Sequence, residues 1–362
     1  MNTEYKQKLD ELRKDIDKID KEIVKLLNER AKIAKEVGKL KKEYNEPVYD
    51  PKRERQIFEK LEKLNKQYGE FPTDAIKPVF REIISACRAT EENLKVAYLG
   101  PRATFTHLAS IRKFGHSVEH IPVPTIKDVF EEIVKDRVDY GVVPVENTIE
   151  GAINHTLDLL IDYPLKITGE IVIEISLHLM SINPDISQIK RVYSHRFGFA
   201  ESQQWLQKYM PHVQTIEVES TAKAAEIVKD DYEAAAIASE AAAELYGLHI
   251  LERKIDIYPQ NFTRFLIIGK NIPSPTDKDK TTFIFSVKNE VGALYKALES
   301  LYKNKINMTK IESRPKKTEA WDYIFFTDIE GHIENPHVKK ALEELKEKTP
   351  FFKVLGSYPK AQ

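Results

Sequence analysis

The sequence has a single cysteine, Cys87, among 362 residues. One thiol excludes an intramolecular disulfide framework and is typical of a protein kept in a reducing compartment. The chain is charged from Glu4 onward, so no apolar secretory leader is expected at its start. No run approaches the roughly 18 apolar residues of a membrane-spanning helix, so no membrane partner is expected. Together these absences predict a soluble, cytoplasmic protein.

The chain also lacks an excess of charge of either sign. It has 56 basic and 57 acidic residues and a net charge of −1, so no global field favours nucleic acid as a partner. Cofactor motifs are missing as well: there is no His/Cys cluster with metal-ligand spacing, no Walker loop and no glycine-rich dinucleotide turn. The sequence therefore predicts neither a metal nor another cofactor.

What the chain does have is an apolar stripe near its start, with members three and four residues apart. The stripe consists of Leu9, Leu12, Ile16, Ile19, Ile23, Leu26, Arg30, Ile33, Val37 and Leu40. This spacing is typical of a heptad seam on one continuous helix. A helix of about 40 residues would be roughly 60 Å long, too long for the short helices that follow to cover. A second copy of the chain is the expected cover, which predicts a homodimer.

Arg30 interrupts this stripe with a positive charge. An unpaired cation among packed side chains is unfavourable, so a negative group must lie opposite it. An ion pair across the seam, or a side chain that reaches water, would also explain the arginine. Other cations favour a binding site, because Lys41 follows three turns later on nearly the same face and Arg13 lies toward the other end.

Two shorter helices are expected next. The first begins at Asp50-Pro51, with Asp50 as N-cap, and carries Arg53 and Glu54. The second runs from about Thr73 to Glu91. Their inward positions are expected to be Ile57, Phe58, Leu61, Leu64, Ile76, Val79, Phe80, Ile83, Ile84 and Cys87. Four cations with few carboxylates on inward-leaning positions describe a pocket for a small dianion.

This first segment resembles the all-helical chorismate mutase family, whose domain has three helices and is an intertwined dimer. The resemblance rests on Leu12-Arg13-Lys14, Leu27-Asn28-Glu29-Arg30, Val37-Gly38-Lys39-Leu40-Lys41 and Asp50-Pro51-Lys52-Arg53-Glu54-Arg55. It implies that Arg13 from the partner chain, Arg30 and Arg53 hold the two carboxylates of chorismate. The rearrangement has no covalent step for the protein, so orientation and charge stabilisation are what a site must supply.

The same resemblance implies roles for the remaining polar groups. Lys41 would face the ether oxygen of chorismate, and Glu54 with Asp50 would face the ring hydroxyl. Glu91 stands where the family often has a glutamine that donates to the ether oxygen. Because a carboxylate would repel the negative charge that grows there, Glu91 must be protonated in the working state.

From Leu94 onward, short apolar strands alternate with helices, which predicts an α/β region with a mostly parallel sheet. Strands are expected at 95–99, 118–121, 140–143, 191–194, 213–218 and 234–238. One or two crossing strands are expected within 165–181, and the chain is expected to return at 261–268. Two lobes joined by crossing segments would form a cleft, with ligands at the carboxyl ends of the strands.

Polar residues follow several of these strands. They are Thr104 and Thr106, Glu146-Asn147, Ser194-His195 and Glu219-Ser220-Thr221. Thr104, Ser220 and Thr221 could be plain helix N-caps. Their recurrence at strand ends favours an anion or carboxylate site, because helix N-termini attract anions.

This segment resembles the prephenate dehydratase family. The matching motifs are Leu99-Gly100-Pro101-Arg102-Ala103-Thr104-Phe105-Thr106-His107, Gly141-Val142-Val143-Pro144-Val145-Glu146-Asn147, Ser194-His195 and Asn261-Phe262-Thr263-Arg264-Phe265. The resemblance implies that Thr263 carries the chemistry and that the site is shaped by Asn147, Ser194, Glu219 and Thr221. Thr104, Thr106 and Arg264 complete the predicted prephenate-binding set.

The implied reaction removes carbon dioxide and water from prephenate, and Thr263 would donate a hydrogen bond or a proton to the leaving oxygen. Two positions depart from the family pattern. Ala103 stands where many members have glycine, which matters if the loop needs a positive φ. Glu201 stands where glutamine is common.

A proline-containing linker at 271–277 precedes a β-α-β-β-α-β pattern, which suggests a ferredoxin-like α+β fold. The expected elements are 281–287, 291–303, 307–312, 321–329, 336–348 and 351–358. The segment resembles the amino-acid-binding ACT domain at Gly292-Ala293-Leu294-Tyr295 and Glu312-Ser313-Arg314-Pro315. The resemblance implies that phenylalanine binds at Gly292, Ala293, Leu294, Glu312, Ser313 and Arg314. Helix entry at Gly292 and a solvated loop at Arg314 are the plain alternatives.

The sequence thus predicts a multidomain chain with boundaries at 1–92, 94–271 and 279–362. The expected function is a bifunctional enzyme that takes chorismate through prephenate to phenylpyruvate under feedback inhibition by phenylalanine. The catalytic residues would be Lys41, Glu91 and Thr263. A non-catalytic amino-acid sensor with a dimerisation arm, and an enzyme with only the dehydratase site active, are the alternatives. The assembly could be a dimer or a tetramer.

Overall fold

The computed structural model describes residues 3–44, 46–257, 260–315 and 323–361. The chain divides into two compact units, and each is described by itself. The first takes the described residues up to Leu94 together with Phe114–Glu119, and the second takes the rest. The expected start of the 321–329 strand, at Trp321, lies outside the described residues.

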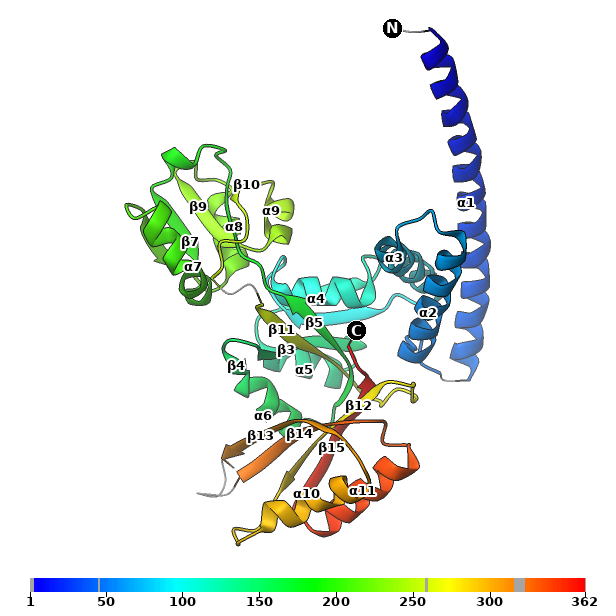
Figure 1. Ribbon diagram of the computed structural model, residues 1–362, viewed down its shortest axis with the longest axis vertical. Helices are drawn as coiled ribbons and strands as arrows, with labels where there is room; N and C mark the ends of the chain where they lie inside the picture. Colours follow the sequence, from blue (N-terminus) through cyan, green and yellow to red (C-terminus); the bar gives the residue numbers. More distant parts are fainter. Residues whose placement is uncertain (1–2, 45, 258–259, 316–322, 362) are drawn as a thin grey trace. The chain divides into compact units, whose positions relative to one another are not determined.

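The first unit consists of α1 (Thr3–Glu43), α2 (Pro51–Tyr68) and α3 (Thr73–Glu91), as the sequence predicts (Figure 1). Asp50 is the N-cap of α2, where its side chain accepts a hydrogen bond from the backbone N–H of Arg53 at 3.0 Å. Helix α1 packs closely on α3 at Gly38, where a Cβ would lie 2.7 Å from the Cβ of Glu91. A side chain at position 38 would therefore push the two helices apart.

The predicted apolar stripe of α1 is exposed in the single chain. Its members from Leu12 to Leu40, apart from Arg30, are 42–66% exposed, while Arg30 and Leu9 are half-buried. Two inward positions were predicted wrongly, because Leu64 on α2 is 45% exposed and Val79 on α3 is 44% exposed. The buried faces of the two helices are narrower than the apolar pattern suggests.

The second unit contains a sheet of ten described strands in the order β13-β14-β12-β15-β5-β11-β3-β1-β2, with β4 paired to β3. Its N-terminal strands and helices are β1 (Lys95–Leu99), α4 (Phe105–Phe114), β2 (Glu119–Val123), α5 (Ile126–Val134), β3 (Tyr140–Asn147), β4 (Gly151–Ala152), α6 (Asn154–Asp162), β5 (Lys166–Glu174) and β11 (Phe262–Gly269). Strand β3 is longer than the predicted 140–143, because its second half continues the ladder with β11.

A second sheet of five strands has the order β10-β6-β9-β7-β8. Its elements are β6 (His178–Ser181), β7 (Arg191–Ser194), α7 (Arg196–Tyr209), β8 (Gln214–Glu217), α8 (Thr221–Val228), β9 (Ala234–Ala238), α9 (Glu240–Tyr246) and β10 (His249–Glu252), with a 3₁₀ turn at Ile186–Gln188. The short strands β4 and β10 were not predicted.

The expectation of mostly parallel sheets was wrong. Strands β1 and β3 are parallel, as are β7 with β8 and with β9. However, β11 runs antiparallel to both β3 and β5, and β6 runs antiparallel to β9 and β10. The reason is topological: β5 leads the chain out to the second sheet and β11 brings it straight back, so the returning strand pairs in the opposite direction.

The C-terminal elements are β12 (Asp279–Ser286), α10 (Ala293–Lys303), β13 (Met308–Pro315), β14 (Tyr323–Glu330), α11 (Pro336–Glu347) and β15 (Phe351–Pro359). Their strands form an antiparallel ladder with α10 and α11 on one face, which confirms the ferredoxin-like pattern (Figure 1). Strand β15 also meets β5 in parallel at Gly356, where a Cβ would lie 2.2 Å from the carbonyl oxygen of Ile167.

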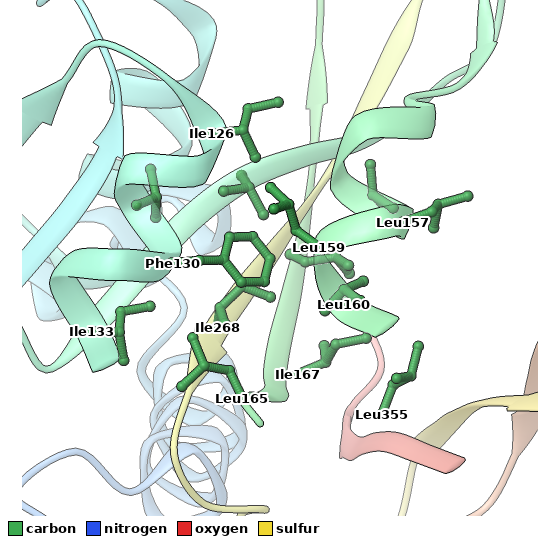
Figure 2. Packing of buried hydrophobic residues seen from close by; sticks show 14 of the residues in the cluster. Ile126, Phe130, Ile133, Leu157, Leu159, Leu160, Leu165, Ile167, Ile268 and Leu355 are labelled. Carbon is green, nitrogen blue, oxygen red and sulfur yellow. The ribbon is translucent and has the colours of Figure 1, made fainter. Parts of the chain in front are cut away.

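The other face of these C-terminal strands belongs to the core of the dehydratase-like region. Figure 2 shows Leu355 of β15 close to Leu160 of α6 and Ile167 of β5. Ile284, Ile324, Phe326 and Tyr358 belong to the same buried cluster as Phe130 and Leu157. The C-terminal sheet is therefore buried on both faces, by its own helices on one side and by the preceding region on the other.

Candidate active sites

The helical unit buries a cluster of charged side chains between α2 and α3. Arg88 is only 6% exposed, and its Nη2 donates to the Oε2 of Glu54 at 2.5 Å. The guanidinium also lies over the ring of Tyr49, 4.8 Å from the ring centre. The Nη1 atom of Arg88 is buried and has no hydrogen-bond partner among the described residues.

Glu91 lies one turn after Arg88 and carries a perturbed carboxyl group. Burial raises its pKa above the usual value, although Lys41, Arg88 and Arg30 pull in the opposite direction. Its Oε2 is buried without a hydrogen-bond partner in the described part of the chain. A carboxyl group with a raised pKa among several cations can remain protonated and donate a hydrogen bond.

Arg30 and Arg53 line one pocket of about 450 Å³, together with apolar side chains that include Ile57, Leu61 and Phe80. Lys41 is half-buried, and its Nζ donates to the carbonyl oxygen of Val48 at 2.7 Å. Arg53 is exposed in the single chain, so its predicted inward position is not reached within one copy.

Arg13 lies on α1, the helix that also carries Arg30, but far from Arg30. Seventeen residues separate Arg13 from Arg30, which corresponds to about 26 Å at the rise of an α-helix. Within its own chain Arg13 is exposed and pairs with Asp10 at 3.7 Å. A contribution of Arg13 to a pocket at Arg30 therefore requires another copy of the chain.

In the second unit, Asn147 and Thr263 face each other at the ends of β3 and β11. The Nδ2 of Asn147 donates to the Oγ1 of Thr263 at 2.9 Å and to the Oδ1 of Asn261 at 2.8 Å. The Oδ1 of Asn147 accepts the backbone N–H groups of Ile149 and Glu150. Because the Thr263 oxygen accepts the bond from Asn147, its own hydroxyl proton is left for another acceptor.

A second group of predicted residues lines a pocket of about 620 Å³. Thr104, Thr106 and Glu219 share it with Ser220 and Lys223. Two of these hydroxyls also have the local roles that the sequence left open. Thr104 accepts the N–H of His107 at 3.2 Å, and Ser220 caps α8 by accepting the N–H of Lys223.

Ser194 and Thr221 form a third group around Gly198. Both are buried, and a Cβ at Gly198 would lie 2.2 Å from the Ser194 Oγ and 3.4 Å from the Thr221 Cγ2. The Ser194 hydroxyl donates to the carbonyl oxygen of Ile237 at 3.0 Å and so joins β7 to β9. Seven of the eight predicted prephenate ligands thus lie at the ends of β3 and β11, at the pocket of Thr104 or around Gly198.

The six predicted phenylalanine ligands of the C-terminal region form two sets of three. Gly292, Ala293 and Leu294 line a pocket of about 400 Å³ with Phe325 and Tyr295. Gly292 has φ +78°, a left-handed conformation that begins α10 without a side-chain penalty.

Strand β13 carries the other three predicted phenylalanine ligands, Glu312, Ser313 and Arg314. Arg314 donates to Asp158 at 2.6 Å and to the carbonyl oxygen of Asn154 at 2.7 Å, both on α6. Arg314 is therefore neither part of that pocket within one chain nor a solvated loop residue.

Comparisons with known proteins agree with all three segments. Residues 12–92 match the family model of chorismate mutase type II, residues 96–273 match prephenate dehydratase, and residues 281–347 match the ACT domain. A bifunctional chorismate mutase/prephenate dehydratase of Aquifex aeolicus is 57% identical over 88% of this chain and 88% of its own length. The chain belongs to the bifunctional chorismate mutase/prephenate dehydratase family. It carries both enzyme domains, followed by an ACT domain.

Two further relatives extend the comparison. The Stutzerimonas stutzeri member of this family is 44% identical over 86% of this chain and 86% of its own length. A solved structure of the prephenate dehydratase from Arthrobacter aurescens, in complex with L-Phe, is 29% identical. It covers 74% of this chain and 90% of its own chain, with a TM-score of 0.67.

Arg264 of the dehydratase domain, predicted to bind prephenate, is held by protein groups within the single chain. Its Nε donates to Glu170 at 2.7 Å, its Nη1 to Asp328 at 2.7 Å and its Nη2 to the Tyr358 hydroxyl at 2.9 Å. Each guanidinium nitrogen thus has a protein acceptor, two of them in the ACT domain. Strand alternation explains why Arg264 does not point toward Asn147 as Thr263 does, because neighbouring side chains on β11 point to opposite faces of the sheet.

Sequence reasoning missed three polar residues of the enzyme domains. Arg88 follows Ile84 by four residues, so it is a cation within an apolar helical stripe, the same signal that singled out Arg30. Asn261 is 1% exposed, and its Nδ2 is buried without a partner in the described chain. Lys223 lines the pocket of Thr104 and Glu219, and only the fold indicates this.

Glu201, which departs from the family pattern, is 3% exposed. Burial raises its pKa, and the nearby carboxylates of Asp256 and Glu150 raise it further.

Within the described residues no helix is long and apolar enough to cross a membrane. Nor do three or more His, Cys, Asp or Glu side chains gather there in a metal-binding arrangement.

Proposed function

We propose that the helical domain rearranges chorismate to prephenate within an intertwined homodimer. The breaking ether bond leaves negative charge on its oxygen, which Lys41 and protonated Glu91 stabilise while Arg30, Arg53 and the partner's Arg13 hold the carboxylates. Asp50 and Glu54 contact the ring hydroxyl, and Arg88 orients Glu54. The support is the half-buried Arg30, whose charge acts on Glu91, and the Glu91 Oε2 atom, which is buried without a hydrogen-bond partner among the described residues.

The dimer proposal rests on two features of α1. Eight apolar residues of one face are exposed in the single chain, and Arg13 is about 26 Å along the helix from Arg30. A facing copy would cover the apolar stripe and supply the missing arginine. A tetramer, formed through further contacts of the ACT domains, is compatible with this dimer. The cytoplasm remains the expected location.

We further propose that the dehydratase domain converts prephenate to phenylpyruvate. The carboxylate bonded directly to the ring leaves as carbon dioxide while the pyruvyl side chain is kept, the bonding electrons enter the ring, and the ring hydroxyl departs as water after gaining a proton. Thr263 donates a hydrogen bond to that leaving oxygen, and Asn147 holds Thr263 in place. The bond from Asn147 to the Thr263 oxygen carries this proposal.

The remaining predicted ligands complete the proposal. Thr104, Thr106, Glu219, Ser194 and Thr221 shape the cleft around prephenate. Phenylalanine binds the ACT domain at Gly292, Ala293 and Leu294, and a second ACT domain supplies Glu312 and Ser313. We place the domain boundaries at 1–92, 94–271 and 279–362.

One assay tests both activities. Pure full-length protein is given chorismate, and prephenate and phenylpyruvate are followed over time with and without phenylalanine. Both products should form in sequence, and phenylalanine should lower phenylpyruvate formation. Prephenate that accumulates without phenylpyruvate would mean that only the mutase is active. Absence of both products would leave the chain a non-catalytic amino-acid sensor.

A further inference from the structure

Arg264 follows Thr263 directly on β11, and Glu146 precedes Asn147 directly on β3. The two strands pair so that Thr263 faces Asn147 and Arg264 faces Glu146. Because side chains alternate along a strand, the first pair lies on one face of the sheet and the second on the other. The charged pair is therefore the immediate backbone neighbour of the hydrogen-bonded pair.

The guanidinium of Arg264 joins two domains at one point. Glu170 on β5 belongs to the dehydratase domain, while Asp328 on β14 and Tyr358 on β15 belong to the ACT domain. These three acceptors are 4% exposed or less. Lys280 of β12 adds a second cation to Glu170 at 2.8 Å, so the buried charges balance.

Tyr358 and Asp328 are held in turn by the ACT domain. The Thr282 hydroxyl lies 2.6 Å from an oxygen of Asp328 and 2.6 Å from the Tyr358 hydroxyl. Burial alone would raise the pKa of Glu170, but Arg264 and Lys280 beside it hold that pKa below its usual value. Glu170 is therefore held as a carboxylate between two cations.

A second connection reaches the other strand of the site. Lys310 of β13 lies 3.0 Å from Glu146 and 3.2 Å from Glu312, one of the residues proposed to bind phenylalanine. A shift of β13 would therefore pull on Glu146, the neighbour of Asn147. Both strands that carry the Asn147–Thr263 bond are tied to the ACT strands by charged contacts.

We propose that Arg264 is a positioning residue of the dehydratase site, which couples the arrangement of the ACT domain to the placement of Thr263. An effector on the ACT domain can change catalysis only through contacts that differ between two arrangements. The Arg264 cluster supplies such contacts one residue from Thr263. The inference rests on the proposed dehydratase function and removes Arg264 from the substrate ligands.

Tyr358→Phe is the first test, because it removes one acceptor of Arg264 and leaves every charge in place. The full chain is assayed for prephenate turnover with and without phenylalanine, and the mutase rate of the same preparation reports correctly folded enzyme. We expect the dehydratase kcat to fall by about tenfold with KM unchanged, and phenylalanine inhibition to weaken by a similar factor. The mutase rate should not change.

Arg264→Lys is the second variant, since lysine keeps the charge but cannot make three directed bonds. It should act in the same direction with a larger effect. Lys360→Met is the matched control, because it breaks an exposed ion pair with Glu330 of the ACT domain at 2.9 Å, outside the cluster. Its kinetics should equal those of the parent.

A raised KM with unchanged kcat and inhibition would make Arg264 a substrate ligand and overturn the proposal. Unchanged kinetics in both variants would do the same. A parallel loss of mutase activity in both would mean that the cluster only maintains the fold, which also overturns it. A parent enzyme without prephenate turnover would refute the dehydratase function first, and the coupling with it.

Discussion

The helical domain and the dehydratase domain complete their predicted sites in different ways. In the helical domain the stripe of α1 is exposed, and Arg13 is about 26 Å along the helix from Arg30. In the dehydratase domain Asn147 and Thr263 already bond at 2.9 Å within one chain. The comparison teaches that the mutase site should depend on association of two chains. The dehydratase site should depend on the pairing of strands within one chain.

The strongest way to separate the two sites is Thr263→Ala. Loss of the hydroxyl should lower phenylpyruvate formation from prephenate by about 1000-fold, the scale of a lost proton or hydrogen-bond donor. Mutase turnover of chorismate should be unchanged. Thr215→Val, at an exposed threonine of β8, is the control. Near-normal phenylpyruvate formation in Thr263→Ala would refute the proposed role.

Ile19→Glu should impair the mutase site and leave the dehydratase site intact. Burial of an unpaired carboxylate in a helical seam is strongly unfavourable, so the protein should dissociate at α1 and lose at least about 100-fold in mutase activity. Prephenate turnover should persist. Lys21→Glu changes a neighbouring exposed position outside the stripe and should do neither. Sedimentation and both assays are the measurements, and an active monomeric mutase would contradict the proposal.

Arg88→Met tests whether the buried cluster of α2 and α3 belongs to the mutase site. Without its cation Glu54 loses its partner at 2.5 Å, and a misplaced ligand should lower mutase kcat/KM by about 30-fold. Lys77→Met removes a more exposed ion pair of the same helix, with Glu62 at 2.9 Å, and should have little effect. Equal effects of the two variants would remove Arg88 from the site.

The mutase activity, and not the dehydratase activity, should depend on whether Glu91 is protonated. Burial raises the Glu91 pKa, so the donating, protonated form persists to higher pH than for an ordinary glutamate and is lost as pH rises through that pKa. Mutase kcat/KM should then fall about tenfold per pH unit. Glu91→Gln should flatten the profile. An unchanged curve in that variant would refute the assignment.

The smallest expected effect concerns Ala103 in the dehydratase domain. Its φ of +63° is a left-handed conformation that disfavours a side chain by about 1 kcal/mol. Ala103→Gly should relieve this strain, but a more flexible unfolded chain offsets part of it. Ala103 also belongs to a buried hydrophobic cluster, so loss of its methyl group offsets the remainder, and the dehydratase Tm should change by roughly 2 °C or less. Ala109→Gly, within α4, should instead lower it.

Much of the local structure could be predicted from the sequence. The stripe of α1, the cap at Asp50 and the strands 95–99, 191–194 and 234–238 agree with the structure. Each depends on neighbours within a few residues. The direction of β11 was missed because a returning strand has no local mark, and Val79 was placed inward because helical periodicity does not show how wide a buried face is.

The sequence by itself determined the three domains, their order and the motifs that carry Thr263, Asn147 and Arg30. Only the tertiary structure decided that Arg264 joins the ACT domain, that Arg88 holds Glu54, and that Leu355 shares a core with α6. The physical reason is that the partners of these residues lie 34 or more positions away along the chain. Helix packing brings Arg88 to Glu54, and strand alternation and sheet order bring the other groups together.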